Sequence, residues 1–282
     1  MNLDALPYTS FIVLLEFAVG SLFVCVYADW RGRVEMSFVK FCAAMVAVAA
    51  GVMLLNALIL DPDAAGGYRL DEDLASTVLI LSAIFAATTL PYNWAVLRED
   101  RRQSLITGAV ASAAGLALIV VVAFYVALPT WGAAGPLLSL VSGTLAVGLV
   151  VLAMTLGHWY LVTPRLPREP LEELTLLLVV AIGIQLVLLV VNAAIPVREA
   201  PDPSAFFGST TLGQNPAFWL RIAIGLVFPG ILGYMSYVSS KGYPANENAM
   251  MSATGLLYIA VGAVLVGEVL ARGLLFLTAK PV

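Results

Sequence analysis

Four ionisable residues lie inside long apolar stretches of this sequence, where a charge is costly. Glu16 and Arg221 each stand alone in such a stretch, whereas Glu268 and Arg272 are four residues apart in the last one. An acid and a base at this spacing can pair along one face of a helix. Ionisable groups surrounded by apolar sequence are candidates for proton transfer or ligand binding. We therefore take Glu16, Arg221, Glu268 and Arg272 as candidate site residues, although only tertiary packing could bring Glu16 and Arg221 to the other two.

Further polar residues could assist this chemistry. Gln185 and Tyr258 lie in apolar stretches and could orient a ring-shaped ligand beside the carboxylates. A second set, Asn93, His158 and Tyr160, lies near the ends of two other apolar stretches, 75–97 and 136–160. His158 is the single histidine of the chain, and an imidazole can relay protons, bind a metal or hydrogen-bond a quinone carbonyl. We take these three as secondary candidates.

A structural interpretation stands beside each functional one. The four charges could be salt bridges that lock helices together, and the two arginines could extend to the membrane surface. Tyrosine and tryptophan near helix ends are common anchors at the membrane–water interface. A lone histidine at a helix end is often simply hydrogen-bonded.

Several redox and metal chemistries lack the residues they need. One histidine cannot supply both axial ligands of a haem, so a bis-histidine cytochrome is excluded unless another chain contributes. The two cysteines, Cys25 and Cys42, form no CxxC motif and no iron–sulfur spacing. No cluster of His, Cys, Asp and Glu predicts a metal site. We expect no covalently bound cofactor and no metal.

The composition indicates which elements position these residues. Of the 282 residues, 61% are hydrophobic and 11% charged, whereas soluble domains carry about 25% charged residues. Such a chain cannot cover a water-facing surface, which excludes a soluble or disordered protein. The 14 basic residues against 18 acidic ones leave no positive excess for nucleic acid. The sequence predicts a protein embedded in a lipid bilayer.

Eight apolar segments are long enough to cross a bilayer, which needs about 20 residues per helix. The predicted fold is an all-α integral membrane protein with one eight-helix domain over residues 1–282. The eight helices could be arranged as two four-helix bundles. The expected spans are 9–28, 36–60, 75–97, 104–128, 136–160, 171–195, 217–240 and 249–277. Pro229, flanked by glycines, predicts a kink or a thinning of the helix in the seventh span.

The connections alternate between basic and non-basic. Nine of the 14 basic residues fall in one set of connections, and the other set, such as 61–73 and 196–216, is poor in them. The positive-inside rule places the basic set in the cytoplasm. We therefore expect a bacterial-type inner membrane protein with both termini outside, and the four charges in the outer half.

The last span carries a short family resemblance. Its sequence Gly267-Glu268-Val269-Leu270-Ala271-Arg272-Gly273-Leu274-Leu275-Phe276 resembles the ending of the membrane-anchor subunits of DMSO reductase and polysulfide reductase, the NrfD-like group. The resemblance implies two four-helix bundles without a prosthetic group, which bind a quinol and pass electrons to iron–sulfur and molybdopterin subunits. Only Glu268 and Arg272 match residue by residue, and His158 falls on the inner side, away from the family's site.

Three functions remain open from the sequence. The first is a quinone-interacting anchor subunit of an electron-transfer complex, whose partner chains carry haem, iron–sulfur or molybdopterin centres. It would be at most a quinol-binding subunit of an oxidoreductase, with Glu16 or Glu268 accepting protons. The second is a small-solute or ion transporter, favoured by the kinked seventh span. The third is a purely structural membrane subunit.

Overall fold

The computed structural model describes residues 5–60, 68, 70–127, 132–163, 166–195, 212–241 and 247–282. Its regular structure is helical, and eight of its helical spans are long and apolar enough to cross a membrane. The elements are α1 (Leu6–Arg31), α2 (Met36–Ala57), η2 (Glu72–Leu74), α3 (Ala75–Leu97), α4 (Arg101–Tyr125), α5 (Ala134–Val162), α6 (Glu169–Ala194), η4 (Leu212–Gln214), α7 (Pro216–Leu220), η5 (Arg221–Val227), α8 (Phe228–Ser240) and α9 (Glu247–Thr278).

The eight predicted spans are confirmed, and every boundary agrees within three residues. The seventh span consists of α7, η5 and α8 in succession. Parts of the predicted connections, at 61–67, 128–131 and 196–211, lie outside the described residues. Arg69 and Arg165 lie outside them as well.

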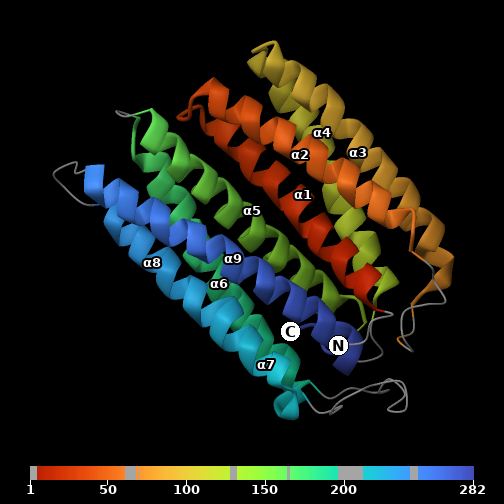
Figure 1. Ribbon diagram of the computed structural model, residues 1–282. Coiled ribbons are helices and arrows are strands. Elements are labelled where there is room, and N and C mark those ends of the chain that lie inside the picture. Colours follow the sequence, from red (N-terminus) through yellow and green to blue (C-terminus); the bar gives the residue numbers. More distant parts are fainter. Residues whose placement is uncertain are drawn as a thin grey trace.

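Helices α1 and α5 form the centre of the molecule. Figure 1 shows them side by side, with α2, α3 and α4 on one side and α6, α8 and α9 on the other. They are also the most buried of the eight spans. Apolar side chains point outward from the surrounding helices, among them Val48, Ile80, Val110, Val187 and Ile259. Such an exposed apolar surface is suited to lipid rather than to water.

The centre depends on one close contact between two glycines. A Cβ atom added to Gly148 of α5 would lie 2.2 Å from the backbone carbon and oxygen of Gly20 on α1. A Cβ atom on Gly20 would lie 2.0 Å from the backbone oxygen of Thr144. Small residues at such crossings let two helix backbones approach closely. This contact sets how near α1 comes to the helices beyond α5.

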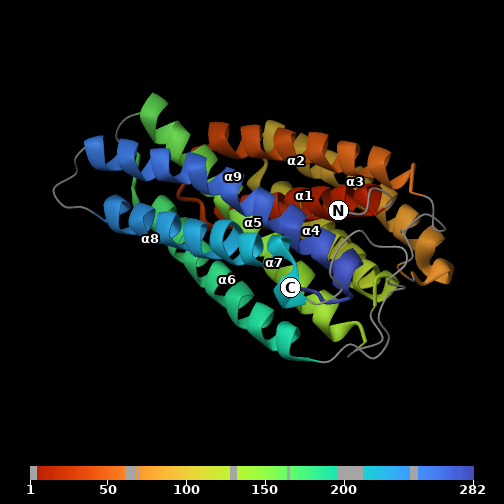
Figure 2. The same ribbon diagram turned by 60° about the horizontal axis from the view of Figure 1, so that its bottom comes forward.

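Basic residues gather at one end of the molecule, which we call the basic end. It includes the end of α1 and the start of α6, where the Arg31 guanidinium lies 3.0 Å from the Glu173 carboxylate. Lys40 of α2 pairs with Glu99 at 2.7 Å, and its hydrogen bond, followed by its charge, lowers the pKa of that carboxyl. The opposite end, which we call the terminal end, holds the start of α1 and the end of α9. There the rings of Tyr8 and Phe276 lie 5.9 Å apart. Figure 2 shows the start of α1 and the end of α9 on this side.

The seventh span departs from a regular α-helix just before Pro229. The span is helical throughout, but residues 221–227 form a π-helix that ends just before this proline. Proline lacks the N–H group that would bond to the carbonyl four residues earlier, and its ring crowds that carbonyl. A wider π turn accommodates both effects without interrupting the helix, and such turns are frequent at functional sites.

The last residues fold back onto the end of α6. Lys280 donates hydrogen bonds to the backbone oxygens of Ala193 at 2.5 Å and Ile195 at 2.9 Å. Asn192 donates to the backbone oxygen of Pro281. Partial burial lowers the pKa of Lys280. A positive charge at the carboxyl end of a helix stabilises that helix, because the last carbonyls are unpaired and the helix dipole is negative there.

We expect Lys280→Met to destabilise the protein by about 1 kcal/mol, because two charge-assisted hydrogen bonds to the end of α6 are lost. The measurement is thermal unfolding of the purified protein in detergent. Arg102→Met, an exposed basic residue at the basic end, is the control and should leave stability nearly unchanged. An equal effect of both substitutions would contradict this role of Lys280.

Candidate functional site

The four charged residues singled out from the sequence meet in one buried cluster. Glu16 comes from α1, Arg221 from η5, and Glu268 and Arg272 from α9. Each side chain is almost completely buried, with at most 3% of its surface exposed. Glu16 and Glu268 each lie ten residues from the helix end at the terminal end of the molecule, or about 15 Å along the axis. We call Glu16, Gln185, Arg221, Glu268 and Arg272 the buried cluster.

Arg272 is the link between the two carboxylates. Its Nη2 atom lies 2.7 Å from Oε1 of Glu16 and 3.0 Å from Oε2 of Glu268. Its Nη1 atom donates to the hydroxyl of Ser139 on α5 at 2.9 Å, and Nη2 also donates to the backbone oxygen of Ser139 at 3.2 Å. One guanidinium therefore joins α1, α5 and α9. The predicted pairing of Glu268 with Arg272 along α9 is present.

Glu268 is surrounded by donors. Besides the contact with Arg272, its Oε1 atom lies 3.2 Å from Nη2 of Arg221 and accepts a hydrogen bond of 2.7 Å from the Gln185 amide. A buried carboxylate with two guanidinium groups and an amide around it is held as an anion, because each contact favours the charged form. Gln185 thus joins the site, as its position in the sixth apolar stretch suggested.

Glu16 has a different environment. Arg272 is its one ion-pair partner among the described residues, and neither carboxylate oxygen is aligned for a hydrogen bond. Gly143 of α5 leaves the space for these groups, because a Cβ atom there would lie 2.5 Å from Oε1 of Glu16. The same atom would lie 2.8 Å from Arg272 Nη2 and from Glu268 Oε2. Glu16 is therefore the carboxylate with spare capacity to bind a proton or a donor.

Arg221 is positioned by the π-helix and by a second glycine contact. It is the first residue of η5, and a Cβ atom on Gly267 of α9 would lie 2.8 Å from its Nη1 atom and 2.5 Å from Gly225 Cα. The close approach of η5 and α9 brings Arg221 beside Glu268. Its Nε and Nη1 atoms are buried and have no hydrogen-bond partner among the described residues. These two N–H groups remain available to an acceptor.

The charges of the buried cluster balance, with two arginines against two glutamates. Burying ions is costly, and mutual pairing offsets that cost only when the geometry and the hydrogen bonds are good. Among the described residues, both oxygens of Glu268 and both Nη atoms of Arg272 have partners, and only Nε of Arg272 lacks one. Glu16 and Arg221, in contrast, each keep two atoms without a hydrogen bond. The cluster can therefore hold a fixed ion pair and, beside it, an acceptor and a donor that a ligand or a proton could use.

Two residues of the site were not predicted, Ser139 and Gly143. Ser139 gives Arg272 two acceptors, and Gly143 leaves room for three charged groups. Both lie on α5 in a run rich in small residues, spaced by four, which places them on one helix face. This four-residue spacing of small residues is the sequence pattern that could have indicated Ser139 and Gly143, although it also occurs in ordinary helix contacts.

Tyr258 does not join the buried cluster, contrary to its predicted role beside the carboxylates. It lies on α9 toward the basic end, is 48% exposed, and its hydroxyl is 2.8 Å from Nδ1 of His158. Its distance from Glu268 follows from ten residues of helix rise, about 15 Å. The tyrosine and the histidine form an outward-facing pair between α5 and α9.

The secondary candidates lie apart from one another. Asn93 donates to the backbone oxygen of Ala43 at 3.4 Å and so connects α3 with α2. Tyr160 donates to the backbone oxygen of Pro167, between α5 and the start of α6. His158 contacts Tyr258 instead. The three side chains therefore belong to three different contacts and make no common site.

Both cysteines are buried, as expected of packing residues, and the Sγ atom of Cys25 lies 3.3 Å from the hydroxyl of Tyr92. Within the part of the chain that the structure describes, no group of three His, Cys, Asp or Glu residues could hold a metal ion. The candidate site therefore consists of carboxylates, guanidinium groups and an amide.

These features define a multi-pass helical membrane protein with a buried, charge-balanced cluster between its central and flanking helices. A comparison with protein-family models finds no match, and a search of curated proteins finds no detectable relative.

Proposed function

We propose that this protein is a membrane subunit of an electron-transfer complex that binds a quinol head group beside the buried cluster. The observation that carries the proposal is the state of Glu16. It is a fully buried carboxylate whose two oxygens lack hydrogen bonds among the described residues, next to a fixed ion pair. Oxidation of a quinol releases two protons along with its two electrons, and a carboxylate with spare acceptor capacity can take up one proton at a time and pass it on.

The residues of the buried cluster have different roles in this proposal. Glu268 stays an anion and holds Arg221 and Arg272 in place. Glu16 accepts a proton, while Arg221 offers its free Nε and Nη1 groups to a carbonyl oxygen. A quinol head group has both hydroxyl donors and, once oxidised, carbonyl acceptors, so the unpaired atoms of Glu16 and Arg221 suit it chemically.

The topology proposed here follows from the positive-inside rule. The basic end faces the cytoplasm, both termini face outward, and the buried cluster lies in the outer half of a bacterial-type inner membrane. Helices α1 to α4 form one four-helix bundle and α5 to α9 the other. Electrons leave to partner subunits that carry haem, iron–sulfur or molybdopterin centres, as in the NrfD-like proteins that the last span resembles.

The proposal is tested by purifying the native complex in mild detergent and recording its protein composition and visible spectrum. Co-purified chains with haem, iron–sulfur or molybdopterin centres are the expected result. A colourless chain that purifies alone and moves a solute or ion across liposomes would replace the proposal by a transporter. Redox partners without any quinol oxidation would leave a purely structural subunit.

Glu16→Gln should lower quinol oxidation by the assembled complex about 100-fold, because general-base assistance to proton transfer contributes roughly that much. The measurement is the rate of quinol oxidation by the purified complex, with subunit composition as the check on assembly. Glu72→Gln, an exposed carboxylate at the start of the third span, is the control and should keep the wild-type rate. An intact Glu16→Gln complex with an unchanged rate would contradict the role of Glu16.

A further inference from the structure

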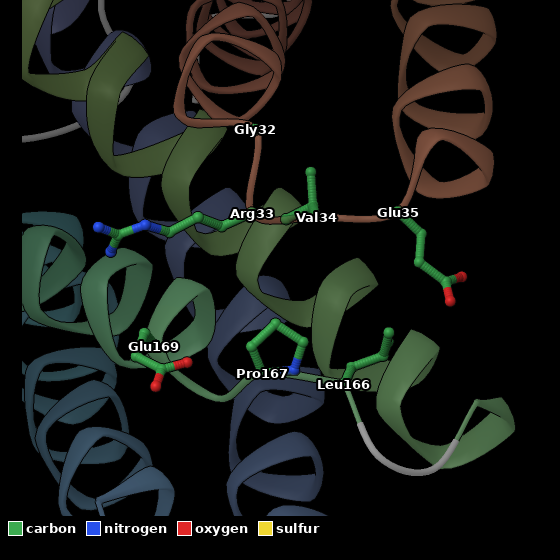
Figure 3. Close-up of a pocket in the computed structure, with 7 residues that line it drawn as sticks. All are labelled: Gly32, Arg33, Val34, Glu35, Leu166, Pro167 and Glu169. Carbon is green, nitrogen blue, oxygen red and sulfur yellow. The ribbon is translucent and has the colours of Figure 1, made fainter.

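An open cleft of about 580 Å³ lies at the basic end, far along the helices from the buried cluster. It is formed where the α1–α2 turn meets the segment leading into α6. Its lining residues are Gly32, Arg33, Val34, Glu35, Leu166, Pro167 and Glu169. Figure 3 shows the side chains of Arg33 and Glu169 on one side of this cleft, and that of Glu35 reaching away on the other. Its volume is within the range of ligand sites, about 300–1,000 Å³.

The cleft combines one free positive charge with one free negative charge. Among the described residues, neither the Arg33 side chain nor the Glu169 side chain forms a hydrogen bond or an ion pair. The remaining lining carboxylate, Glu35, accepts hydrogen bonds on its Oε2 atom from Trp159 at 3.2 Å and from Ser37 at 3.1 Å, and its side chain points away from Arg33 and Glu169 (Figure 3). The neighbouring Arg31 is paired with Glu173. The cleft thus leaves two opposite charges for a ligand that carries both.

The position of the cleft restricts the ligand further. It lies at the ends of four membrane-spanning helices, α1, α2, α5 and α6, where lipid head groups meet the protein. Val34, Leu166 and Pro167 supply an apolar wall. A ligand with a zwitterionic head and an apolar body matches these surroundings.

The geometry points to a binding site for the phosphoethanolamine head group of a phospholipid in this cleft. The guanidinium of Arg33 pairs with the phosphate, as arginine does in charge-assisted contacts with phosphate oxygens. The carboxylate of Glu169 accepts hydrogen bonds from the primary ammonium group. A choline head group keeps its positive charge but has no N–H to donate, and a glycerol head group can donate from its hydroxyls but has no cation, so each contacts Glu169 more weakly than ethanolamine does. This inference is independent of the proposed redox function.

The test is lipid titration into delipidated, detergent-solubilised protein, with bound lipid counted by native mass spectrometry. Phosphatidylethanolamine should bind at least about fivefold more tightly than phosphatidylglycerol or phosphatidylcholine, a difference typical of one charge-assisted contact. Glu169→Gln should remove this preference, and Arg33→Gln should weaken the binding of all three lipids. Both side chains are exposed, so neither substitution should impair folding, which thermal unfolding checks.

Two further variants test whether the lipid preference depends on the charges of the cleft. Glu169→Lys should reverse the preference toward phosphatidylglycerol, because the cleft then carries two positive charges. Arg102→Gln removes an exposed basic residue at the same end that does not line the cleft, and should bind all three lipids as the wild type does. A wild-type preference for phosphatidylglycerol that survives Glu169→Gln would overturn the inference in favour of a plain anion site. Wild-type binding by both cleft variants would overturn it altogether.

Discussion

Arg272→Met should destabilise the protein by about 3–5 kcal/mol, because it leaves two buried carboxylates with a single arginine. Arg272 is fully buried and is the group that contacts Glu16, Glu268 and Ser139 together. Without it, Glu16 loses its ion-pair partner in the interior. The measurement is thermal unfolding in detergent, together with the yield of monodisperse protein. Arg102→Met should behave as the wild type does.

A second substitution separates charge balance from simple packing. Glu16→Gln added to Arg272→Met returns the cluster to one anion and one cation, Glu268 and Arg221. The double variant should regain about half of the lost stability, since residues in one ion-pair network couple strongly. If the double variant is as unstable as Arg272→Met alone, charge balance is not what holds the cluster together.

Gly148→Ala should cost about 3 kcal/mol, at the upper end of overpacking effects, because the added methyl group meets backbone rather than a movable side chain. The added carbon would lie 2.2 Å from the backbone of Gly20, so α1 and α5 must separate. Separation also displaces Glu16 from Arg272. Glu16 lies on α1, whereas Ser139, which holds Arg272 in place, lies on α5. Unfolding temperature and the rate of quinol oxidation should therefore both fall.

The matched control for this variant is Gly183→Ala on α6, where an added Cβ atom meets nothing within 4 Å. Alanine favours a helix over glycine by up to about 1 kcal/mol, so this control should be neutral or slightly stabilising. A Gly148→Ala protein as stable as the Gly183→Ala protein would show that the glycine contact does not set the distance between α1 and α5.

The positions of the spans were predictable from composition, whereas their rotations were not. Apolar length places the helices, because each must match the thickness of the bilayer. Which face of α1 turns toward α9 depends on tertiary contacts such as Gly20 against Gly148, and no pattern within α1 encodes them. The pairing of Glu268 with Arg272 is local to one helix and could therefore be predicted. The contact of Glu16 with Arg272 depends on tertiary packing and could not be.

The geometry of one helix is enough to separate Tyr258 from the carboxylates. Tyr258 and Glu268 share α9, and ten residues of rise already separate them by about 15 Å. Pro229 is the opposite example. Its presence predicts that the seventh span is disturbed, but the sequence does not determine the form of that disturbance. A proline disturbs the turn before it, and whether that turn opens or widens into a π-helix depends on the neighbouring helix, here through Gly267.

The central claim is that Glu16 takes up a proton when quinol is oxidised beside the buried cluster. The most direct measurement is an infrared difference spectrum of the purified complex, recorded as quinol is added. We predict the appearance of the C=O stretch of a protonated carboxylic acid in the wild type and in Glu72→Gln, and its loss in Glu16→Gln. The same band persisting in Glu16→Gln, or no band in the wild type, would contradict the account.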